Sequence, residues 1–313
     1  MRGLASRCRH AKAALVAAGV LGVEGLAGFA ARAQAPQPYS INLGGRSLGG
    51  AEAPRATSST ESEPETLQFS AKGGIASDYI YRGTTLSDGK PAFGAGFEAT
   101  YGWLYAGSTV ASVKLPTRPN AEIAVSGGVR PTWRNIELDL GIIYFAYPGE
   151  LPGSPGIDYW ETALRAAAPV GDSFRVAAGY AFSPNVSNTG AWSQYAAAGF
   201  GFEVPAHVLP KDIGASFTTA AGYSWFGRQS LALGGFELPA YLNWQAGVTF
   251  THKAFNLDIR YYDTNLSKED CFVFTGDPGA QLGGHRDPIT NPTGLVSNWC
   301  SAALVVKAWY ALN

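Results

Sequence analysis

Two short segments of this sequence match motifs that perform chemistry in other proteins. Residues 94–99, Gly-Ala-Gly-Phe-Glu-Ala, match the G-x-G-x-x-A pattern of dinucleotide-binding loops, and residues 87–90, Ser-Asp-Gly-Lys, match the S-x-x-K of serine acyl-enzymes. The first pattern binds a dinucleotide only where it joins a strand to a helix, and here it lies inside a segment of alternating polarity. The second lacks the partner motifs S-D-N and K-T-G. We therefore expect a strand at the first segment and a turn at the second.

Metal ligands and nucleophiles are also poorly placed for chemistry. After the N-terminal segment the histidines are His207, His252 and His285, and no two of them have the spacing of metal ligands. No serine is placed as a membrane-embedded catalytic triad would need. The sequence therefore predicts a protein that is not an enzyme and that has no metal and no cofactor.

Twelve ionisable residues have the clearest functional potential, because they fall on the polar positions of predicted strands. Six are basic and six are acidic: Lys72, Arg130, Arg165, Arg175, Arg260 and Lys307 against Glu98, Glu122, Glu137, Asp139, Glu161 and Asp258. Lining a narrow pore, they would pair across strands and create a transverse field that passes small polar solutes and excludes apolar ones. Their balanced charge predicts weak ion selectivity.

Such residues must be positioned by strands, and the sequence from Leu67 to Leu312 repeats a strand pattern about a dozen times. Apolar Leu138 and Leu140, for example, alternate with Glu137 and Asp139, and successive side chains of a strand point to opposite faces. The expected strands are residues 67–79, 91–101, 103–113, 121–131, 135–146, 158–168, 173–182, 192–202, 213–225, 240–250, 254–263 and 300–312. An even number of two-faced strands is typical of a transmembrane β-barrel, with lipid outside and a watery lumen inside.

The connections between the expected strands alternate in length. Counted from a periplasmic N-terminus, the connections at the periplasmic end are short except for residues 203–212, and those at the other end are longer, up to residues 265–299. Short periplasmic turns and long extracellular loops are typical of outer-membrane barrels. Ten or fourteen strands stay open as alternatives, because residues 226–241 or 272–296 can contain a further pair.

The two faces of the strands favour a membrane barrel over a soluble barrel or sandwich. Aromatic residues recur near strand ends, as at Tyr101, Trp103 and Tyr105, and predict two girdles at the membrane interfaces. The polar face carries small residues and few charges, as at Ala106 and Ser108. A soluble periplasmic protein would carry Lys and Glu on that face, so the small residues favour a confined lumen.

The N-terminus predicts export. Four basic residues precede the apolar run Ala13–Val23, and Ala31-Arg32-Ala33 forms an A-x-A cleavage site. We expect a signal peptide at 1–33, a disordered leader rich in Pro, Gly and Ser at 34–64, and one barrel at 65–313. A net charge of −1 argues against a nucleic-acid partner.

Two cysteines suit an exported protein. Cys271 lies in the last long connection and Cys300 opens the last strand, so a disulfide between them would close a loop of about thirty residues in an oxidising compartment. Such a loop is stabilised by about 3–4 kcal/mol, and it would be able to fold into the pore mouth. Two free thiols are the alternative.

Several motifs resemble a known family. The run Ser77-Asp78-Tyr79-Ile80-Tyr81-Arg82-Gly83, continued by Ser87 and Asp88, is similar to the opening motif of the TorF family of porins, also called the Gcw_chp family. Further similar segments are residues 103–108, 142–148, 158–161 and 261–264. The resemblance implies an outer-membrane barrel without a cofactor or a catalytic residue. One departure is the ending Trp309-Tyr310-Ala311-Leu312-Asn313, because such barrels commonly end in an aromatic residue that the insertion machinery recognises.

Together these observations predict an all-β protein, a twelve-stranded antiparallel up-and-down barrel in the outer membrane of a Gram-negative bacterium. Twelve strands lie between side-chain-filled eight-stranded barrels and wide sixteen-stranded channels, so we expect a narrow pore for passive diffusion of small hydrophilic solutes. Its expected partners are outer-membrane lipid, the barrel-insertion machinery and those solutes, and a homo-oligomer stays open. The alternative is a plugged barrel with a structural or surface-interaction role.

Overall fold

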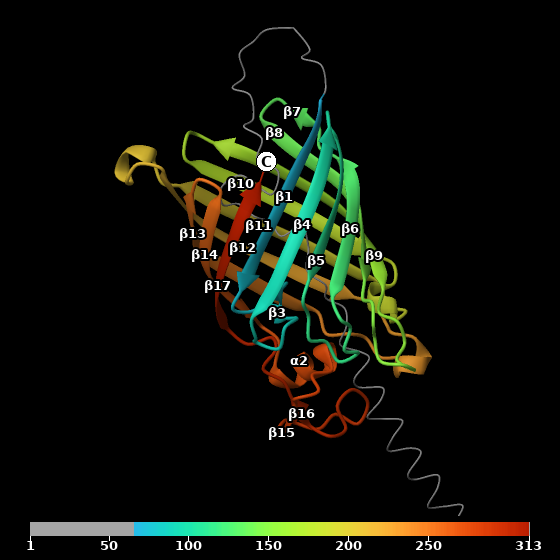
Figure 1. Cartoon of the computed structure of the whole chain (residues 1–313). Helices are drawn as coiled ribbons and strands as arrows, with labels where there is room; N and C mark the ends of the chain where they lie inside the picture. Colours follow the sequence, from blue (N-terminus) through green and yellow to red (C-terminus); the bar gives the residue numbers. More distant parts are fainter. Residues whose placement is uncertain (1–65, 313) are drawn as a thin grey trace, which may run out of the picture.

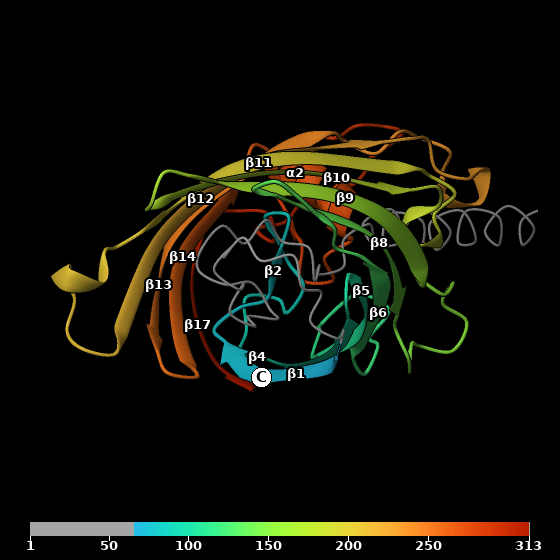
Figure 2. The ribbon, with the colours of Figure 1, turned by 90° about the horizontal axis from the view of Figure 1, so that it is seen from above.

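A computed structural model describes residues 66–312, and it forms a closed antiparallel β-barrel of twelve long strands (Figures 1 and 2). The strands are β1 (Leu67–Ala76), β4 (Ala92–Tyr101), β5 (Leu104–Ala111), β6 (Glu122–Val129), β8 (Ile136–Ala146), β9 (Tyr159–Val170), β10 (Phe174–Ser183), β11 (Ser193–Glu203), β12 (Ile213–Phe226), β13 (Tyr241–His252), β14 (Phe255–Thr264) and β17 (Ala303–Leu312). Each pairs with the next, and β1 pairs with β17 to close the ring. The predicted fold class and strand count are confirmed. The expected signal peptide and leader lie outside the described residues.

Shorter elements lie in the connections. They are β2 (Ile80–Tyr81), β3 (Thr84–Thr85), β7 (Thr132–Trp133), β15 (Gln281–Leu282), β16 (Leu295–Val296), the helix α2 (Lys268–Thr275) and three 3-10 turns at Val186–Asn188, Ala206–Val208 and Leu231–Leu233. The helix and the longest connection lie at one end of the barrel, called here the loop end, and the C-terminus lies at the other, the turn end (Figure 1). Among the described residues, no helix is long and apolar enough to cross a membrane.

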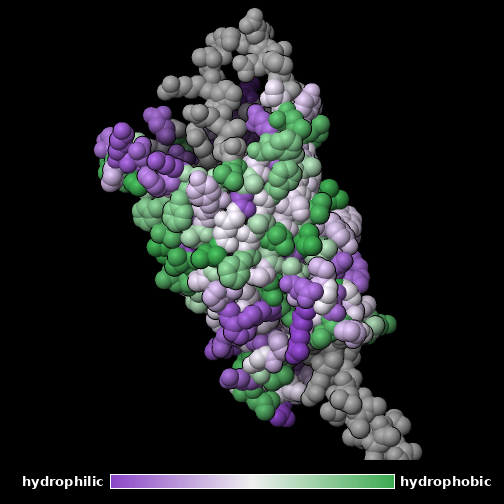
Figure 3. Space-filling view, in the orientation of Figure 1, coloured by the Kyte–Doolittle hydropathy of each residue, from purple (hydrophilic) through white to green (hydrophobic). Residues whose placement is uncertain are grey.

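Large apolar side chains cover the outside of the barrel. On β8, Leu140, Ile142 and Tyr144 are about half exposed, whereas Asp139 and Ile143, at the alternate positions of the strand, are buried. Figure 3 shows apolar residues gathered over the strands and hydrophilic residues concentrated toward the two ends. In a closed barrel the backbone N–H and C=O groups form hydrogen bonds between neighbouring strands. The outer face therefore does not need water as a hydrogen-bond partner for the backbone.

The aromatic residues at strand ends follow the predicted girdles in most places and depart from them at β5. Tyr101 and Trp103 are exposed, as are Phe174 and Tyr310 on other strands. Tyr105, however, is buried and points inward, because Leu104 takes the outward position after the turn at Gly102. The prediction that Ala106 and Ser108 face the lumen was therefore wrong by one residue.

A charge placed on the apolar outer face should destabilise the barrel only if that face contacts lipid. For Ile142→Arg, in the middle of β8, we expect the free energy of unfolding in lipid vesicles to fall by about 2–4 kcal/mol. For Leu231→Arg, on a loop where the side chain is 91% exposed, we expect less than about 0.5 kcal/mol. Urea titration of both refolded variants measures the difference, and equal effects would contradict a lipid-facing wall.

Candidate functional site: the lumen and its inward hairpin

The segment after β1 folds into the barrel. Strands β2 and β3 form a two-residue hairpin, residues 80–85, here called the inward hairpin, and β2 lies within the ring of strands in the axial view (Figure 2). At its turn Arg82 and Gly83 have φ angles of 44° and 85°, as a type I′ turn requires. A left-handed φ is uncommon for arginine, and contacts of the Arg82 side chain support this conformation.

Arg82 supplies those contacts by reaching the opposite wall. Its Nη1 and Nη2 donate to the two carboxylate oxygens of Glu161 on β9, at 3.3 and 3.0 Å. Its guanidinium also lies 4.2 Å from the ring centroid of Tyr195 on β11, and Tyr241 on β13 donates to its carbonyl at 3.2 Å. Glu161 is fully buried and Arg82 is 8% exposed, so this is a bidentate ion pair away from water. Together, these contacts of Arg82 tie the hairpin to β9, β11 and β13.

The base of the hairpin is held by the residues of the opening motif. Asp78 accepts from the hydroxyls of Thr85 and Ser87 at 2.5 and 2.8 Å, and Ser77 accepts from the backbone of β17. Trp299 donates to Asp88 at 3.1 Å. Ser87 and Asp88 lie in a turn, as predicted for the S-x-x-K segment. The motif residues therefore build the hairpin.

Glu122, at the start of β6, is bound by two phenols. Tyr79 and Tyr147 donate to its two oxygens at 3.3 and 3.0 Å. Burial, followed by the neighbouring carboxylate, raises the pKa of both tyrosines well above their usual range, so both stay protonated and donate. Glu122 is 1% exposed and is part of the packed region beside the hairpin.

Apolar side chains pack around the hairpin at the loop end and form a mouth cluster. Phe274 of α2 contacts the rings of Phe226 and Tyr241, each at 5.2 Å between centroids, and Ile143 and Phe145 of β8 are fully buried in the same cluster. The inward face of β8 thus changes along its length, from Asp139 near the turn end to apolar residues near the loop end. The lumen, expected to be watery, is therefore filled by apolar side chains at its loop end.

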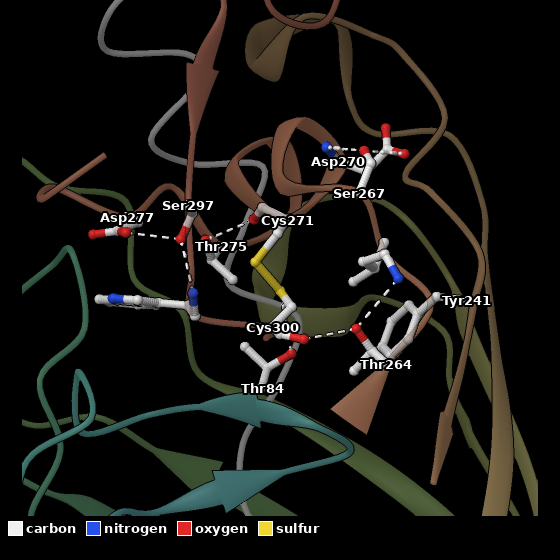
Figure 4. Close-up of a disulfide and its surroundings, with 12 residues drawn as sticks. Thr84, Tyr241, Thr264, Ser267, Asp270, Cys271, Thr275, Asp277, Ser297 and Cys300 are labelled. Carbon is white, nitrogen blue, oxygen red and sulfur yellow. Dashed lines mark hydrogen bonds between the residues drawn. A yellow bond between two sulfur atoms is a disulfide. The ribbon is translucent and has the colours of Figure 1, made fainter. Parts of the chain in front are cut away.

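A disulfide joins Cys271 of α2 to Cys300, just before β17 (Figure 4). Thr264 of β14 donates to the carbonyl of Cys300 at 2.8 Å, and the hydroxyl of Thr84 in the hairpin lies 3.8 Å from its sulfur. The bridge therefore holds α2 against the hairpin and the barrel wall. The last loop covers the mouth, where Phe274 enters the cluster.

A cavity of about 330 Å³ extends from the hairpin into the lumen. Charged residues among its lining are Lys72, Arg82, Asp258, Arg260 and Lys307, together with the polar Asn243, Gln245 and Tyr262. Arg260 places Nε 3.2 and 3.0 Å from the two oxygens of Asp258. Lys307 donates to the phenol of Tyr262 at 2.5 Å. The cavity therefore contains charged and polar groups among small and apolar residues, in contrast to the mouth cluster.

Ion pairs cover the wall formed by β4 to β10. Arg130 donates to both oxygens of Glu98 at 2.6 and 2.9 Å and to Asp139 at 3.0 Å, and its guanidinium lies 3.8 Å from the ring centroid of Tyr105. Arg175 pairs with Glu137, and Arg165 is the register partner of Asp139. These six charged residues form what we call the ladder.

The twelve charged residues predicted for the lumen thus fall into three groups. Glu122 and Glu161 belong to the packed hairpin region, six belong to the ladder, and four face the cavity: Lys72, Asp258, Arg260 and Lys307. Sequence reasoning assigned Arg82 to the family motif alone and missed Tyr195 as its stacking partner. The Arg82-Gly83 dipeptide between two short β-prone pairs was the available hairpin signal.

Comparison with known proteins gives one family match. A family model described as a bacterial protein of unknown function, Gcw_chp, matches residues 60–285. No curated protein matches the chain.

Solved structures of similar architecture are distant in sequence. The KdgM porin has a TM-score of 0.42 at 8% identity, and the NanC porin has 0.42 at 7%; each match covers 79% of this chain and 100% of the other. An outer-membrane channel from Pseudomonas putida F1 has 0.40 at 11%, covering 80% and 95%.

Removing one partner of the hairpin ion pair should destabilise the protein. Glu161→Gln leaves the Arg82 charge buried without a counter-ion, and we expect the free energy of unfolding to fall by about 3 kcal/mol. The matched control is Glu137→Gln, because the Glu137 side chain is 54% exposed and such pairs contribute at most about 1 kcal/mol. Urea unfolding in vesicles compares them. A loss below about 1 kcal/mol for Glu161→Gln would show that the pair does not anchor the hairpin.

Proposed function

We propose that this chain, which belongs to the Gcw_chp family of bacterial proteins, is a narrow outer-membrane channel for passive diffusion of small hydrophilic solutes. The observation that carries the proposal is a cavity of about 330 Å³, with five charged side chains in its lining, inside a closed barrel whose outer face is apolar. A soluble protein would bury its apolar residues and expose its charged ones. Here many large apolar side chains face outward, and most of the strand-borne charges face inward.

The outer membrane is the location that this arrangement supports. A closed barrel with an apolar outer band, short turns at one end and long loops at the other suits the outer membrane of a Gram-negative bacterium. Lipid would contact the outer strands, and the insertion machinery would act on the barrel as it does on others of its class. The predicted signal peptide would deliver the chain to that route.

Solutes would cross between the ladder and the cavity wall and then pass the inward hairpin. In this structure the hairpin and mouth cluster occupy the loop end, so permeation requires them to shift. We therefore propose a small conductance that the inward hairpin and the mouth cluster limit. The chain would need no energy input, because the solute moves down its own gradient.

A second function is favoured by the mouth cluster itself. A barrel filled at its loop end by a bridged loop is also suited to a structural or surface-interaction role without transport. Leu231, Leu282 and Ile289 are 91%, 73% and 73% exposed in the loops, as contact residues would be. The two functions differ in whether solute passes the hairpin.

Loosening the hairpin separates the two functions. In Arg82→Asn/Glu161→Gln both charges disappear, and asparagine tolerates the left-handed turn conformation. We expect small, infrequent single-channel currents from the refolded wild-type protein and larger or longer openings from the double variant. Lys211→Gln, in the exposed connection before β12, should behave as wild type. If neither the wild type nor the double variant conducts, although both are folded, the barrel is sealed and the second function holds.

Cutting the disulfide tests the last loop in the same way. Cys271→Ser/Cys300→Ser frees a loop that the bridge stabilises by about 3–4 kcal/mol, so liposomes containing this variant should swell faster in small sugars. Reductant should speed swelling for the wild type and leave the variant unchanged. Identical swelling rates in all conditions would show that the bridged loop does not limit permeation.

A further inference from the structure

The hairpin alters the charge balance of the lumen. The sequence places six basic and six acidic residues on inward positions, but two of the acids are bound within the packed region: Glu161 by Arg82 and Glu122 by two tyrosines. None of the six basic residues in this set forms an ion pair with a residue of the inward hairpin. The lumen beyond the hairpin therefore contains more basic than acidic side chains.

This excess lies on one wall. In the ladder, three bases face three acids: Arg130, Arg165 and Arg175 against Glu98, Glu137 and Asp139. On β1, β14 and β17, in contrast, Lys72, Arg260 and Lys307 share a single carboxylate, Asp258. Asp258 is the register partner of Lys307 and also accepts from Arg260. The positive charge of Lys72 and Lys307 together therefore exceeds the negative charge that the single carboxylate of Asp258 supplies.

Lys72 is the clearest part of that excess. Lys72 pairs with Gly96 of β4 in the strand register. Glu98, two residues further along β4, accepts two hydrogen bonds from Arg130 through its two carboxylate oxygens. Within residues 66–312 Lys72 makes no hydrogen bond or ion pair, although it lines the cavity. Its ammonium group has three donors, and no protein acceptor within the described residues uses them.

Resting on the proposed channel function, we infer that the cavity is a binding site for small organic anions with carboxylate groups, and that the channel prefers anions to cations. Lys72 and Lys307 supply the attraction, and Asn243 and Gln245 line the same space as neutral partners. A cavity of about 330 Å³ suits a ligand of a few carbon atoms. Fixed charges of one sign in a cleft with low-dielectric walls raise the local concentration of the opposite ion.

Ion selectivity of the refolded protein in a planar bilayer tests this inference. Under a potassium chloride gradient we expect a reversal potential that shows several-fold preference for chloride over potassium. Lys72→Met/Lys307→Met should bring the permeability ratio close to one, and each single variant should lie between. Lys211→Met, outside the lumen, should keep the wild-type ratio. A wild-type preference for potassium, or a ratio that the double variant does not change, would overturn the inference while leaving a conducting channel.

A binding measurement keeps the inference testable if no current is seen. Titration calorimetry with sodium succinate should show binding to the wild type and to Lys211→Met, and at least a tenfold weaker affinity for the lysine double variant. Absence of current with this pattern would contradict the channel and support the anion site. Equal succinate affinity in all three proteins, or none, would overturn the anion site.

Discussion

Burying an arginine and a glutamate away from water costs several kcal/mol for each ion, and the Arg82–Glu161 pair offsets part of that cost with two hydrogen bonds across the lumen. Much of the interior follows from it. The pair anchors the inward hairpin at its left-handed turn. Tyr81 of the hairpin and Leu86, just after it, belong to the mouth cluster, and the disulfide holds α2 against the same hairpin (Figure 4). Without the pair, the strained turn and the packed mouth would lose their common support.

The barrel consequently has two different interiors. Near the loop end the inward positions are apolar and packed like a soluble core, whereas nearer the turn end they carry ion pairs and a cavity with charged side chains in its lining. An apolar barrier next to a charged chamber is a suitable arrangement for limiting flow, because ions avoid the first and gather in the second. In the proposed channel, the hairpin that narrows the pore would also remove Glu161 from its charge balance, so gating and selectivity would both depend on one segment.

Prediction from sequence succeeded where the physics is local and failed where it is long-range. Alternation along β8 or β14 predicted each strand within a few residues, because successive side chains of a barrel strand face outward and inward in turn. At β5 the turn at Gly102 shifted the register by one residue and placed Tyr105 inside, where it donates to Asp139. The contacts of Arg82 could not be predicted, because its partner Glu161 is 79 residues away and nothing local requires the loop to fold inward.

By itself the sequence determined the class of fold, the two cysteines available for a bridge and the inventory of inward charges, and it favoured twelve strands over ten or fourteen, since these depend on periodicity and composition. The tertiary structure decided which charges pair. It decided that the motif Ser77–Gly83 builds a hairpin inside the lumen, that the loop end is packed, and that the excess positive charge lies at Lys72 and Lys307. The physical reason is that charge balance in a lumen depends on which acidic groups are already bound, and that is set by contacts between segments far apart in the chain.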